Sequence, residues 1–581
     1  MRSHCFPLCA LLALFGSLHL AACDSRGAIG DSLAVQPLAP TNGAGVALEK
    51  GLPIARPIFR WSATPAAARF ELQVDDSCAS PASCSFPSPE IYETALSGTT
   101  YTAGTGLAAA PSPPLEHRYY WRVRACQEDA CGDWSGARYL VVGVSGGLLN
   151  TDLNGDGYQD AVVGAPASSA GAQQAGRVAV YLGGATLTTS PALVITHDRA
   201  FEELGTSVAM VGDVNGDGFG DFLVRTLGDE STTGLAPAPH AYVYFGGVTL
   251  HSQPDVVLDC GSVDDENGAA AGIGDVNGDG YDDIAIGGTS VGADHMLASP
   301  SRVDIHFGGP TMTNAADLTL RGDGQISKDM QQHQVVLDDF FGSAIAGLGD
   351  MNGDGYPDFV VGSHRRVTGN DTGFARIYFG GPGLRASPDV TLGSPLGDTA
   401  ADLFGFSVSG VGDFNGDKVN DLAVGAPGGS ASYVYFGGPA LGRAPNVTYS
   451  GADRDDWFGA TLASEGDFDG DGFDDLLVMT RGAPQTQGHP LQIAAFRGGT
   501  AADPTPLFTF DAGPGVSEKR GLAVRDVDGD ALPDVLVGCF GPDAQNHGLV
   551  DILLGAKGYV ATAATLSTGD AGDDFGAVIG R

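Results

Sequence analysis

Short runs of alternating apolar and polar residues, separated by glycine-rich turns, recur along most of this chain. Residues 241–245 (Ala-Tyr-Val-Tyr-Phe) and 432–436 (Ser-Tyr-Val-Tyr-Phe) show the pattern, and Gly-Gly follows each run. Period-two alternation with β-branched and aromatic residues is typical of strands rather than helices. From about residue 145 onward, four such strands fill each repeating unit. The pattern therefore predicts an all-β chain built from four-stranded units.

A nine-residue acidic motif, D-x-[ND]-G-D-x-x-x-D, occurs once in each of seven units, and its copies start 54 to 75 residues apart. Oxygen side chains at positions 1, 3, 5 and 9, with a main-chain carbonyl at position 7, suit a hard cation such as Ca²⁺. Glycine at positions 4 and 6 permits the sharp wrap around an ion. One copy alone could be a plain solvated turn, but sevenfold recurrence favours cation binding. Lys418 and Ala531 replace the position-6 glycine, so these two sites are predicted to lose Ca²⁺ first.

The candidate cation ligands are the residues at positions 1, 3, 5, 7 and 9 of the seven motifs. They are Asp152, Asn154, Asp156, Tyr158 and Asp160; Asp213, Asn215, Asp217, Phe219 and Asp221; Asp275, Asn277, Asp279, Tyr281 and Asp283; Asp350, Asn352, Asp354, Tyr356 and Asp358; Asp413, Asn415, Asp417, Val419 and Asp421; Asp467, Asp469, Asp471, Phe473 and Asp475; and Asp526, Asp528, Asp530, Leu532 and Asp534. Together they predict up to seven structural Ca²⁺ ions.

Phe-Gly and Gly-Ala-Pro motifs flank the acidic loops, as in Phe341-Gly342 before one loop and Gly164-Ala165-Pro166 after another. These residues resemble the FG-GAP repeats of the integrin α-subunit head. The resemblance covers residues from about 145 to 581 and implies a seven-bladed β-propeller with its Ca²⁺ loops on one face. Three units depart from the motif and carry Leu-Gly, Asn-Gly or Arg-Gly in place of Phe-Gly.

The last residues of the chain repeat the strand that precedes each acidic loop, including Phe575-Gly576, and stop where a further loop would begin. The first acidic loop, in contrast, has no Phe-Gly strand before it. We therefore expect the C-terminal strand to complete the first blade and to close the ring, which also removes exposed edge strands.

The N-terminal region predicts export and a small β-sandwich. Residues 1–22 resemble a lipoprotein signal peptide whose Leu-Ala-Ala-Cys box places the lipid on Cys23; a simple signal peptide or a membrane helix is the alternative. Residues 23–36 form a linker. Residues 37–143 are similar to fibronectin type III domains and are expected to be a spacer. Residues 144–581 form the propeller.

The charge and the cysteine content limit which binding partners and which cellular compartments are expected for this chain. A net charge of −40 excludes nucleic acid and anionic membrane surfaces as partners, so the membrane is expected to be contacted only through the lipid. Cys78 with Cys84 and Cys126 with Cys131 are expected to form local disulfides, although four cysteines allow three pairings. Cys260 and Cys539 are interpreted as buried free thiols. The predicted location is the cell envelope, at the outer membrane or cell surface, with a secreted or periplasmic protein as the alternative.

No catalytic motif is apparent, because the regularly spaced acids are cation ligands and the histidines lack metal-ligand spacing. The chain is therefore interpreted as a non-enzymatic adhesion or recognition protein that binds a protein or glycan at the face opposite the Ca²⁺ loops. The alternative is a secreted enzyme acting on polysaccharide or phospholipid. An aromatic patch at the channel mouth would favour binding, and a cluster of Lys, Arg, Tyr and His would favour an enzyme. Arg321-Gly322-Asp323, an integrin-ligand tripeptide, is interpreted as a chance match in an ordinary turn.

Overall fold

The fold is known from a computed structural model in which strands make up almost all regular structure. It describes residues 33, 35–40, 44–46, 54–62, 67–78, 84–112, 117–128, 130–142, 149–227, 239–259, 268–288, 301–323, 325–328, 334–337, 339–364, 373–397, 402–452, 456–464, 466–480, 492–501, 503–511, 521–540, 547–555, 562–571 and 573–580. The predicted signal, Cys23 and Cys260 lie outside these residues, and the environment of the Cys539 side chain is likewise not described.

Two main sheets and one short strand pair form a sandwich near the N-terminus. The smaller sheet has the order β1-β4-β7, the larger has the order β2-β11-β9-β5-β6 with β10 on β9, and β3 pairs with β8. The bounds are β1 Pro37–Ala39, β2 Ala44–Val46, β3 Ile54–Ala55, β4 Ile58–Trp61, β5 Arg69–Asp75, β6 Ile91–Leu96, β7 Thr100–Thr102, β8 Leu107–Ala108, β9 His117–Gln127, β10 Ala130–Cys131 and β11 Arg138–Val142.

The sandwich encloses one apolar core between its two sheets. Phe59 and Trp61 from β4 are buried together with Trp121 and Val123 from β9. On the other face of β9, Arg122 and Arg124 stack on Trp134, as the alternation in the sequence predicts.

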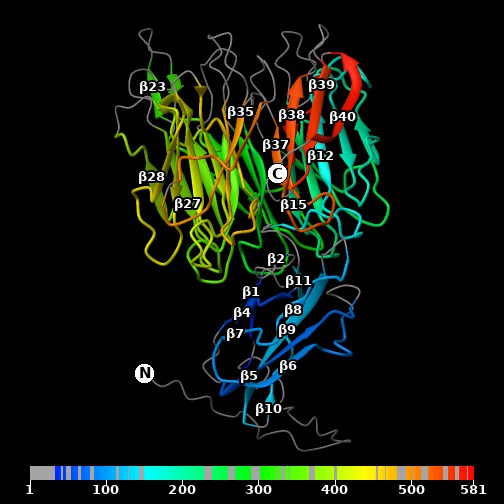
Figure 1. Cartoon of the computed structure of the whole chain (residues 1–581), viewed down its shortest axis with the longest axis vertical. Helices are drawn as coiled ribbons and strands as arrows, with labels where there is room; N and C mark the ends of the chain where they lie inside the picture. Colours follow the sequence, from blue (N-terminus) through cyan, green and yellow to red (C-terminus); the bar gives the residue numbers. More distant parts are fainter. Residues whose placement is uncertain are drawn as a thin grey trace, which may run out of the picture.

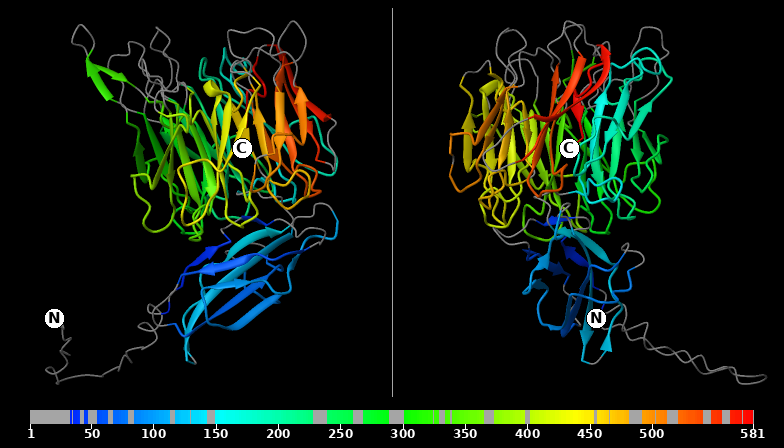
Figure 2. Two further views of the ribbon diagram at one scale, coloured as in Figure 1. Left: turned by 60° about the vertical axis from the view of Figure 1, so that its left-hand side comes forward. Right: turned by 45° about the vertical axis from the view of Figure 1, so that its right-hand side comes forward.

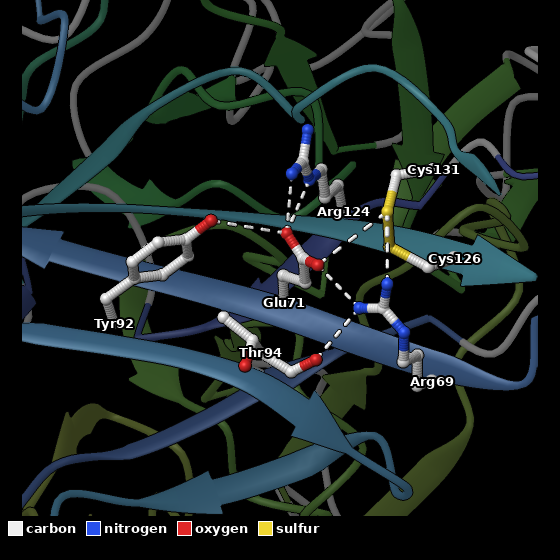
Figure 3. Close-up of a disulfide and its surroundings, with 7 residues drawn as sticks. All are labelled: Arg69, Glu71, Tyr92, Thr94, Arg124, Cys126 and Cys131. Carbon is white, nitrogen blue, oxygen red and sulfur yellow. Dashed lines mark hydrogen bonds and ion pairs between the residues drawn. A yellow bond between two sulfur atoms is a disulfide. The ribbon is translucent and has the colours of Figure 1, made fainter. Parts of the chain in front are cut away.

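Both predicted disulfides of the sandwich are present, Cys78–Cys84 and Cys126–Cys131. Around the second disulfide, the Glu71 carboxylate accepts hydrogen bonds from Arg69 and Arg124 (Figure 3). Disulfides persist in oxidising compartments, so this chain is an extracellular or envelope protein.

Seven four-stranded antiparallel sheets make up most of the remaining fold of the described residues, an arrangement consistent with a β-propeller. The bounds are β12 Ala161–Ala165, β13 Arg177–Tyr181, β14 Leu193–Thr196 and β41 Val578–Ile579; β15 Ser207–Gly212, β16 Asp221–Arg225, β17 His240–Tyr244 and β18 Val256–Asp259; β19 Ala270–Gly274, β20 Asp283–Gly288, β21 Arg302–His306 and β22 Leu318–Arg321; β25 Ala344–Gly349, β26 Asp358–Ser363, β27 Phe374–Tyr378 and β28 Val390–Gly393; β29 Ser407–Gly410, β30 Leu422–Ala426, β31 Ala431–Tyr435 and β32 Val447–Ser450; β33 Thr461–Ala463, β34 Leu476–Met479, β35 Gln492–Phe496 and β36 Phe508–Asp511; and β37 Leu522–Arg525, β38 Asp534–Phe540, β39 His547–Leu553 and β40 Thr562–Ala571.

The longest interval between acidic motifs contains an additional two-stranded sheet, β23 Gln325–Lys328 with β24 Gln334–Leu337. A short 3₁₀ turn, Pro427–Gly429, follows β30.

The seven sheets stand side by side (Figures 1 and 2). The first strand of each sheet contacts the first strand of the next, in the order β15, β19, β25, β29, β33 and β37. The C-terminal strand β41 contacts both β37 and β15, so it lies between the last sheet and the second. The buried residues between the sheets are mainly Val, Ile, Leu, Phe and Tyr from adjoining sheets; one cluster, for example, includes Val162 of β12 and Phe222 of β16.

The C-terminal strand completes the first sheet, as the repeat order predicts. β41 pairs with β12, and the Gly576 and Gly580 amides donate to the carbonyls of Gly164 and Val162. Across the junction with the last sheet, the Gly184 amide donates to the Val527 carbonyl over 2.8 Å. Strands from the two ends of the repeat region are thus joined in one sheet.

The Phe-Gly and Gly-Ala-Pro motifs follow from close approach between neighbouring sheets. Gly164 lies so near the Gly205 carbonyl of the next sheet that an added Cβ would collide with it. Gly538 and Gly576 repeat this contact between the last sheet and the first. In addition, Gly205 and Gly576 adopt φ values of 93° and 78°, a region that favours glycine. The motif glycines therefore allow the sheets to pack tightly.

Candidate cation loops

The position-1 aspartate organises the acidic loops from within. In the first loop, Oδ1 of Asp152 accepts the Gly155 amide over 2.7 Å, and Oδ2 accepts the Gly157 amide over 2.9 Å. Asp467 makes the same pair of contacts with the amides at positions 4 and 6 of its loop. Oδ1 of each aspartate also accepts the position-5 amide. The backbone is thereby wrapped around the carboxylate, and Oδ2 keeps a further lone pair for a ligand.

The position-9 aspartate links each loop to the Gly-Gly turn of its own sheet. Oδ2 of Asp160 accepts the Leu153 amide, and Oδ1 accepts the Gly183 amide over 2.9 Å. The same arrangement occurs in five of the other six repeats, for example at Asp358 with the Met351 and Gly380 amides. In the fifth repeat Oδ2 of Asp421 accepts the Asn415 amide at position 3 instead. This side chain is therefore a structural tie as well as a candidate ligand, a role that the motif spacing did not indicate.

The loop glycines adopt the conformations that the motif predicts. At position 4, φ lies between 74° and 82° in all seven loops, and the five glycines at position 6 have φ between 88° and 103°. Lys418 and Ala531 occupy the same left-handed region with φ of 69° and 65°. For residues with a Cβ this conformation costs about 1–2 kcal/mol. Both loops are therefore strained, as expected.

Replacing Ala531 with Gly is expected to stabilise the protein by about 1 kcal/mol, because the left-handed strain at this position is removed. The matched reverse change is Gly472→Ala, where an added Cβ meets no atom within 4 Å, so its cost of about 1 kcal/mol reflects conformation alone. Denaturant unfolding in excess Ca²⁺ measures both.

In a competing-chelator titration, wild type should release cation first from the Lys418 and Ala531 loops, and A531G should delay one of these releases. Earlier release from any other loop would contradict the strain argument.

The structure brings the candidate carboxylates closest together in the sixth and seventh loops. One carboxylate oxygen from each of Asp467, Asp469 and Asp475 lies within 4.8 Å of the others, and the same holds for Asp526, Asp528 and Asp534. In the first four loops the position-3 asparagine instead donates its amide to the position-5 aspartate, as Asn154 does to Asp156 over 2.9 Å.

The electrostatics of the loops also fit a divalent cation. Burial, with a smaller contribution from neighbouring carboxylates, raises the pKa of Asp358, Asp475 and Asp534 to about 8. Oδ1 of Asp275 is buried without a hydrogen-bond partner. An all-oxygen donor set with excess negative charge suits a hard divalent ion. The residues at positions 1, 3, 5 and 9 would hold it.

The position-7 side chains have a role that the sequence analysis missed. An added Cβ on Gly155 would lie 2.6 Å from the Phe219 ring, and one on Gly216 would lie 2.5 Å from the Tyr281 ring. The aromatic residue of one loop thus covers the position-4 glycine of the preceding loop. The recurrence of Tyr or Phe at position 7 in five of the seven motifs was the available signal.

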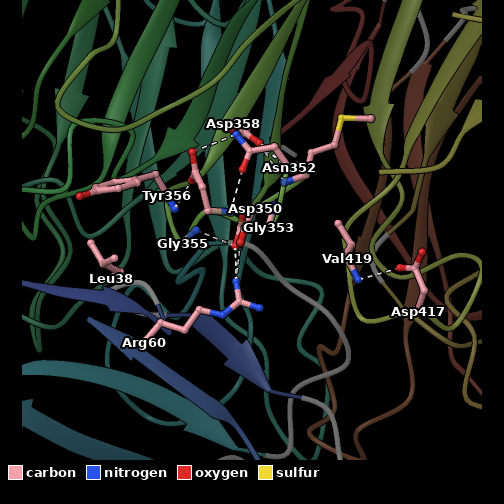
Figure 4. A network of polar contacts seen from close by, with 12 residues as sticks. Leu38, Arg60, Asp350, Asn352, Gly353, Gly355, Tyr356, Asp358, Asp417 and Val419 are labelled. Carbon is pink, nitrogen blue, oxygen red and sulfur yellow. Dashed lines mark hydrogen bonds and ion pairs between the residues drawn. The ribbon is translucent and has the colours of Figure 1, made fainter. Parts of the chain in front are cut away.

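The N-terminal sandwich, expected to be a spacer, contacts three of the acidic loops. Arg60 forms an ion pair with Asp350 over 2.9 Å, as Figure 4 shows, and Arg138 forms one with Asp275 over 2.8 Å. Tyr139 donates to Oδ2 of Asp213 over 3.3 Å. In Figure 1 the sandwich strands lie next to the ends of the sheets that carry these loops.

A run of aromatic rings lies at the opposite ends of three neighbouring sheets. Phe340 stacks on His364 at 5.0 Å between centroids, His364 contacts Phe406 at 5.1 Å, and Phe406 contacts Trp457 edge-on at 5.9 Å. Phe340, Phe406 and Trp457 are half-buried, and they adjoin the first strands of their sheets.

The Arg321-Gly322-Asp323 tripeptide is engaged within the fold. The Asp323 carboxylate pairs with Arg376 over 2.6 Å, and the Gly322 amide donates to the Ser301 carbonyl. These contacts give the tripeptide a structural role. Within the part of the chain that the structure describes, no helix has the length and apolar character needed to cross a membrane.

Comparison with known proteins identifies the repeats. The FG-GAP repeat profile matches residues 146–181, 341–378 and 404–438, and an FG-GAP-like repeat profile matches residues 467–537. Integrin alpha-5 of Xenopus laevis is 32% identical over 240 residues, which is 38% of this chain and 22% of that protein. Integrin alpha-8 of Mus musculus is 26% identical over 379 residues, or 59% of this chain and 33% of that protein. The chain thus matches only a minor part of these relatives' lengths.

Solved structures give weaker overlays. The periplasmic gluconolactonase of Pseudomonas aeruginosa has a TM-score of 0.42 at 14% identity, covering 71% of this chain and 97% of that one. A rhamnogalacturonan lyase of Bacillus licheniformis has a TM-score of 0.33 at 14% identity, covering 92% and 76%. Overlays with TM-scores this low do not indicate an activity for this chain. The chain thus carries FG-GAP repeats and is similar to integrin alpha subunits over part of its length.

Proposed function

We propose that this chain is an exported recognition protein whose seven sheets form a closed, seven-bladed propeller loaded with up to seven structural Ca²⁺ ions. The preshaped acidic loops support the cation assignment, and the pairing of β41 with β12 supports ring closure. No catalytic role is proposed. The sandwich fits a fibronectin type III-like module, and Cys23 is proposed to carry a lipid that anchors the protein in the cell envelope, at the outer membrane or cell surface.

The proposed ligand, a protein or a glycan, binds at the propeller face opposite the cation loops. The aromatic run formed by Phe340, His364, Phe406 and Trp457 is the observation that carries this assignment. Aromatic faces provide large contact area at low entropic cost, and such residues dominate binding energy in many interfaces. The ends of the sheets that carry the cation loops face the sandwich, which leaves less room there for a partner.

An array of glycans and extracellular proteins, probed with the full chain, tests this function. The double variant F406A/W457A is expected to weaken binding of any captured ligand at least about tenfold, because it removes two adjacent rings. Tyr92→Ala is the control, since Tyr92 is an exposed aromatic on the sandwich. Equal loss in both variants would contradict the assignment of the face. Turnover of a polysaccharide or phospholipid without stable retention would favour an enzyme instead.

A further inference from the structure

Two arginines of the sandwich recognise neighbouring loops through the same pair of acceptors. Arg138 donates to Oδ2 of Asp275 and to the Gly278 carbonyl over 2.8 and 3.2 Å. In the next loop, Arg60 donates to Oδ2 of Asp350 and to the Gly353 carbonyl over 2.9 and 3.1 Å. The acceptors are in both cases position 1 and position 4 of the motif. A repeated geometry of this kind indicates specific docking of the sandwich on the loops.

The loop at 213–221 is held by a different set of donors from the same module. Tyr139 donates to Oδ2 of Asp213, and Arg118 donates to the Gly218 carbonyl over 2.7 Å. The Arg118 guanidinium also lies 4.6 Å from the centre of the Tyr139 ring. In all three loops the sandwich therefore uses the same oxygen, Oδ2 of the position-1 aspartate.

In the loop at 275–283 the contacts leave the other oxygen of the position-1 aspartate available, whereas Oδ1 of Asp213 and Oδ1 of Asp350 accept amides of their own loops. Oδ1 of Asp275 is buried without a hydrogen-bond partner, while Oδ2 is bound by Arg138 and the Gly280 amide. Arg138 and Asp275 have only 5% and 0% of their side chains exposed. Arg138 thus occupies Oδ2 of Asp275 and leaves Oδ1 for a cation.

The charges allow arginine and cation to be bound together. The third loop carries Asp275, Asp279 and Asp283 as candidate ligands, and Asp282 is buried beside them. One divalent ion and one guanidinium supply three positive charges against four carboxylates. Without the cation, mutual repulsion of the carboxylates would distort the loop and with it the paired acceptors that the arginine contacts.

We propose that the sandwich is a cation-dependent clasp: divalent cation in the loops at 275–283 and 350–358 and docking of the sandwich through Arg138 and Arg60 stabilise one another. The inference rests on the proposed cation loading of the loops, but not on any ligand of the opposite face. Because coupling between two binding events is reciprocal, cation removal loosens the sandwich, and loss of the arginines weakens cation binding.

The test compares two matched substitutions in the full chain. Asp279→Asn and Asp417→Asn each remove an exposed position-5 carboxylate. Asp279 lies in a loop that the sandwich contacts. Asp417 lies in a loop that receives none of the contacts described above. Small-angle scattering is recorded across a Ca²⁺ titration. At intermediate Ca²⁺, D279N is expected to increase the radius of gyration, whereas D417N is not. Wild type in EDTA should show the same increase as D279N.

The reciprocal arm uses R60Q/R138Q, which removes both guanidinium groups from the interface with the loops. Calorimetry is expected to show about fivefold weaker cation binding at two sites. Tighter binding in this variant would mean that arginine competes with the cation, and it would overturn the clasp. If wild type took up Ca²⁺ normally but kept the same radius of gyration in EDTA, the clasp alone would be overturned. Absence of any uptake would overturn both the clasp and the proposed cation loading.

Discussion

Excess EDTA is expected to lower the free energy of unfolding of the full chain by on the order of 10 kcal/mol. At about 1 mM free Ca²⁺ and a dissociation constant of about 10⁻⁴ M, each bound ion contributes roughly 1.4 kcal/mol, and seven loops contribute additively in the simplest case. This amount is comparable to the whole stability of a typical domain, about 5–15 kcal/mol. Differential scanning calorimetry with and without chelator provides the measurement.

A control for this result separates cation loss from other effects of the chelator. The triple variant D467N/D469N/D475N removes the carboxylates that converge in the sixth loop. Its melting temperature should lie below that of wild type in Ca²⁺ and should change less when EDTA is added. If wild type melted at the same temperature in both buffers and took up no Ca²⁺ by calorimetry, the cation assignment would be wrong.

Deleting residues 573–581 is expected to destabilise the protein by about 5 kcal/mol or more. The deletion removes β41 from the edge of β12, together with the buried side chains of Phe575 and Ile579, each 2% exposed. Truncation of one such side chain costs about 2–5 kcal/mol, and the lost strand pairing adds to this cost. Urea unfolding in Ca²⁺ checks the prediction.

Two single substitutions calibrate the deletion. Phe575→Ala should account for about 3–5 kcal/mol because it leaves a cavity between the first and last sheets. Leu396→Ala, at a side chain that is 57% exposed, should change stability by less than about 0.5 kcal/mol. An unchanged unfolding midpoint for the deletion would refute the closing role of the C-terminal strand.

Much of the fold was predictable because the repeat supplies seven copies of the same local signals. Alternation in residues 241–245 and the turn glycines fixed strand type and order, and the C-terminal Phe575-Gly576 pair indicated the partner of β12. The left-handed conformation at position 6 followed from the preference for glycine there, and Lys418 and Ala531 confirm it. The two local disulfides were predictable from the short spacing of their cysteines.

The contacts between modules were not predictable from local pattern. Arg60 and Arg138 lie in sandwich strands, and nothing near them in the sequence indicates a partner more than a hundred residues away. The aromatic run was equally hidden, since Phe340, Phe406 and Trp457 come from three different units. Such groupings depend on the angle between sheets and on docking of the modules, and both are set by tertiary packing.

Joining β41 to β12 has a consequence for how this protein reaches its native state. The strand partners Val163 and Ile579 are roughly 400 residues apart, so their pairing closes a very long loop and gives the ring a high contact order. During synthesis, the sandwich can fold while later repeats are still emerging, but the first sheet stays incomplete until β41 has been made. Until then β12 presents an open edge, and we expect this interval to be the period of greatest exposure to proteases and to misassembly with another copy.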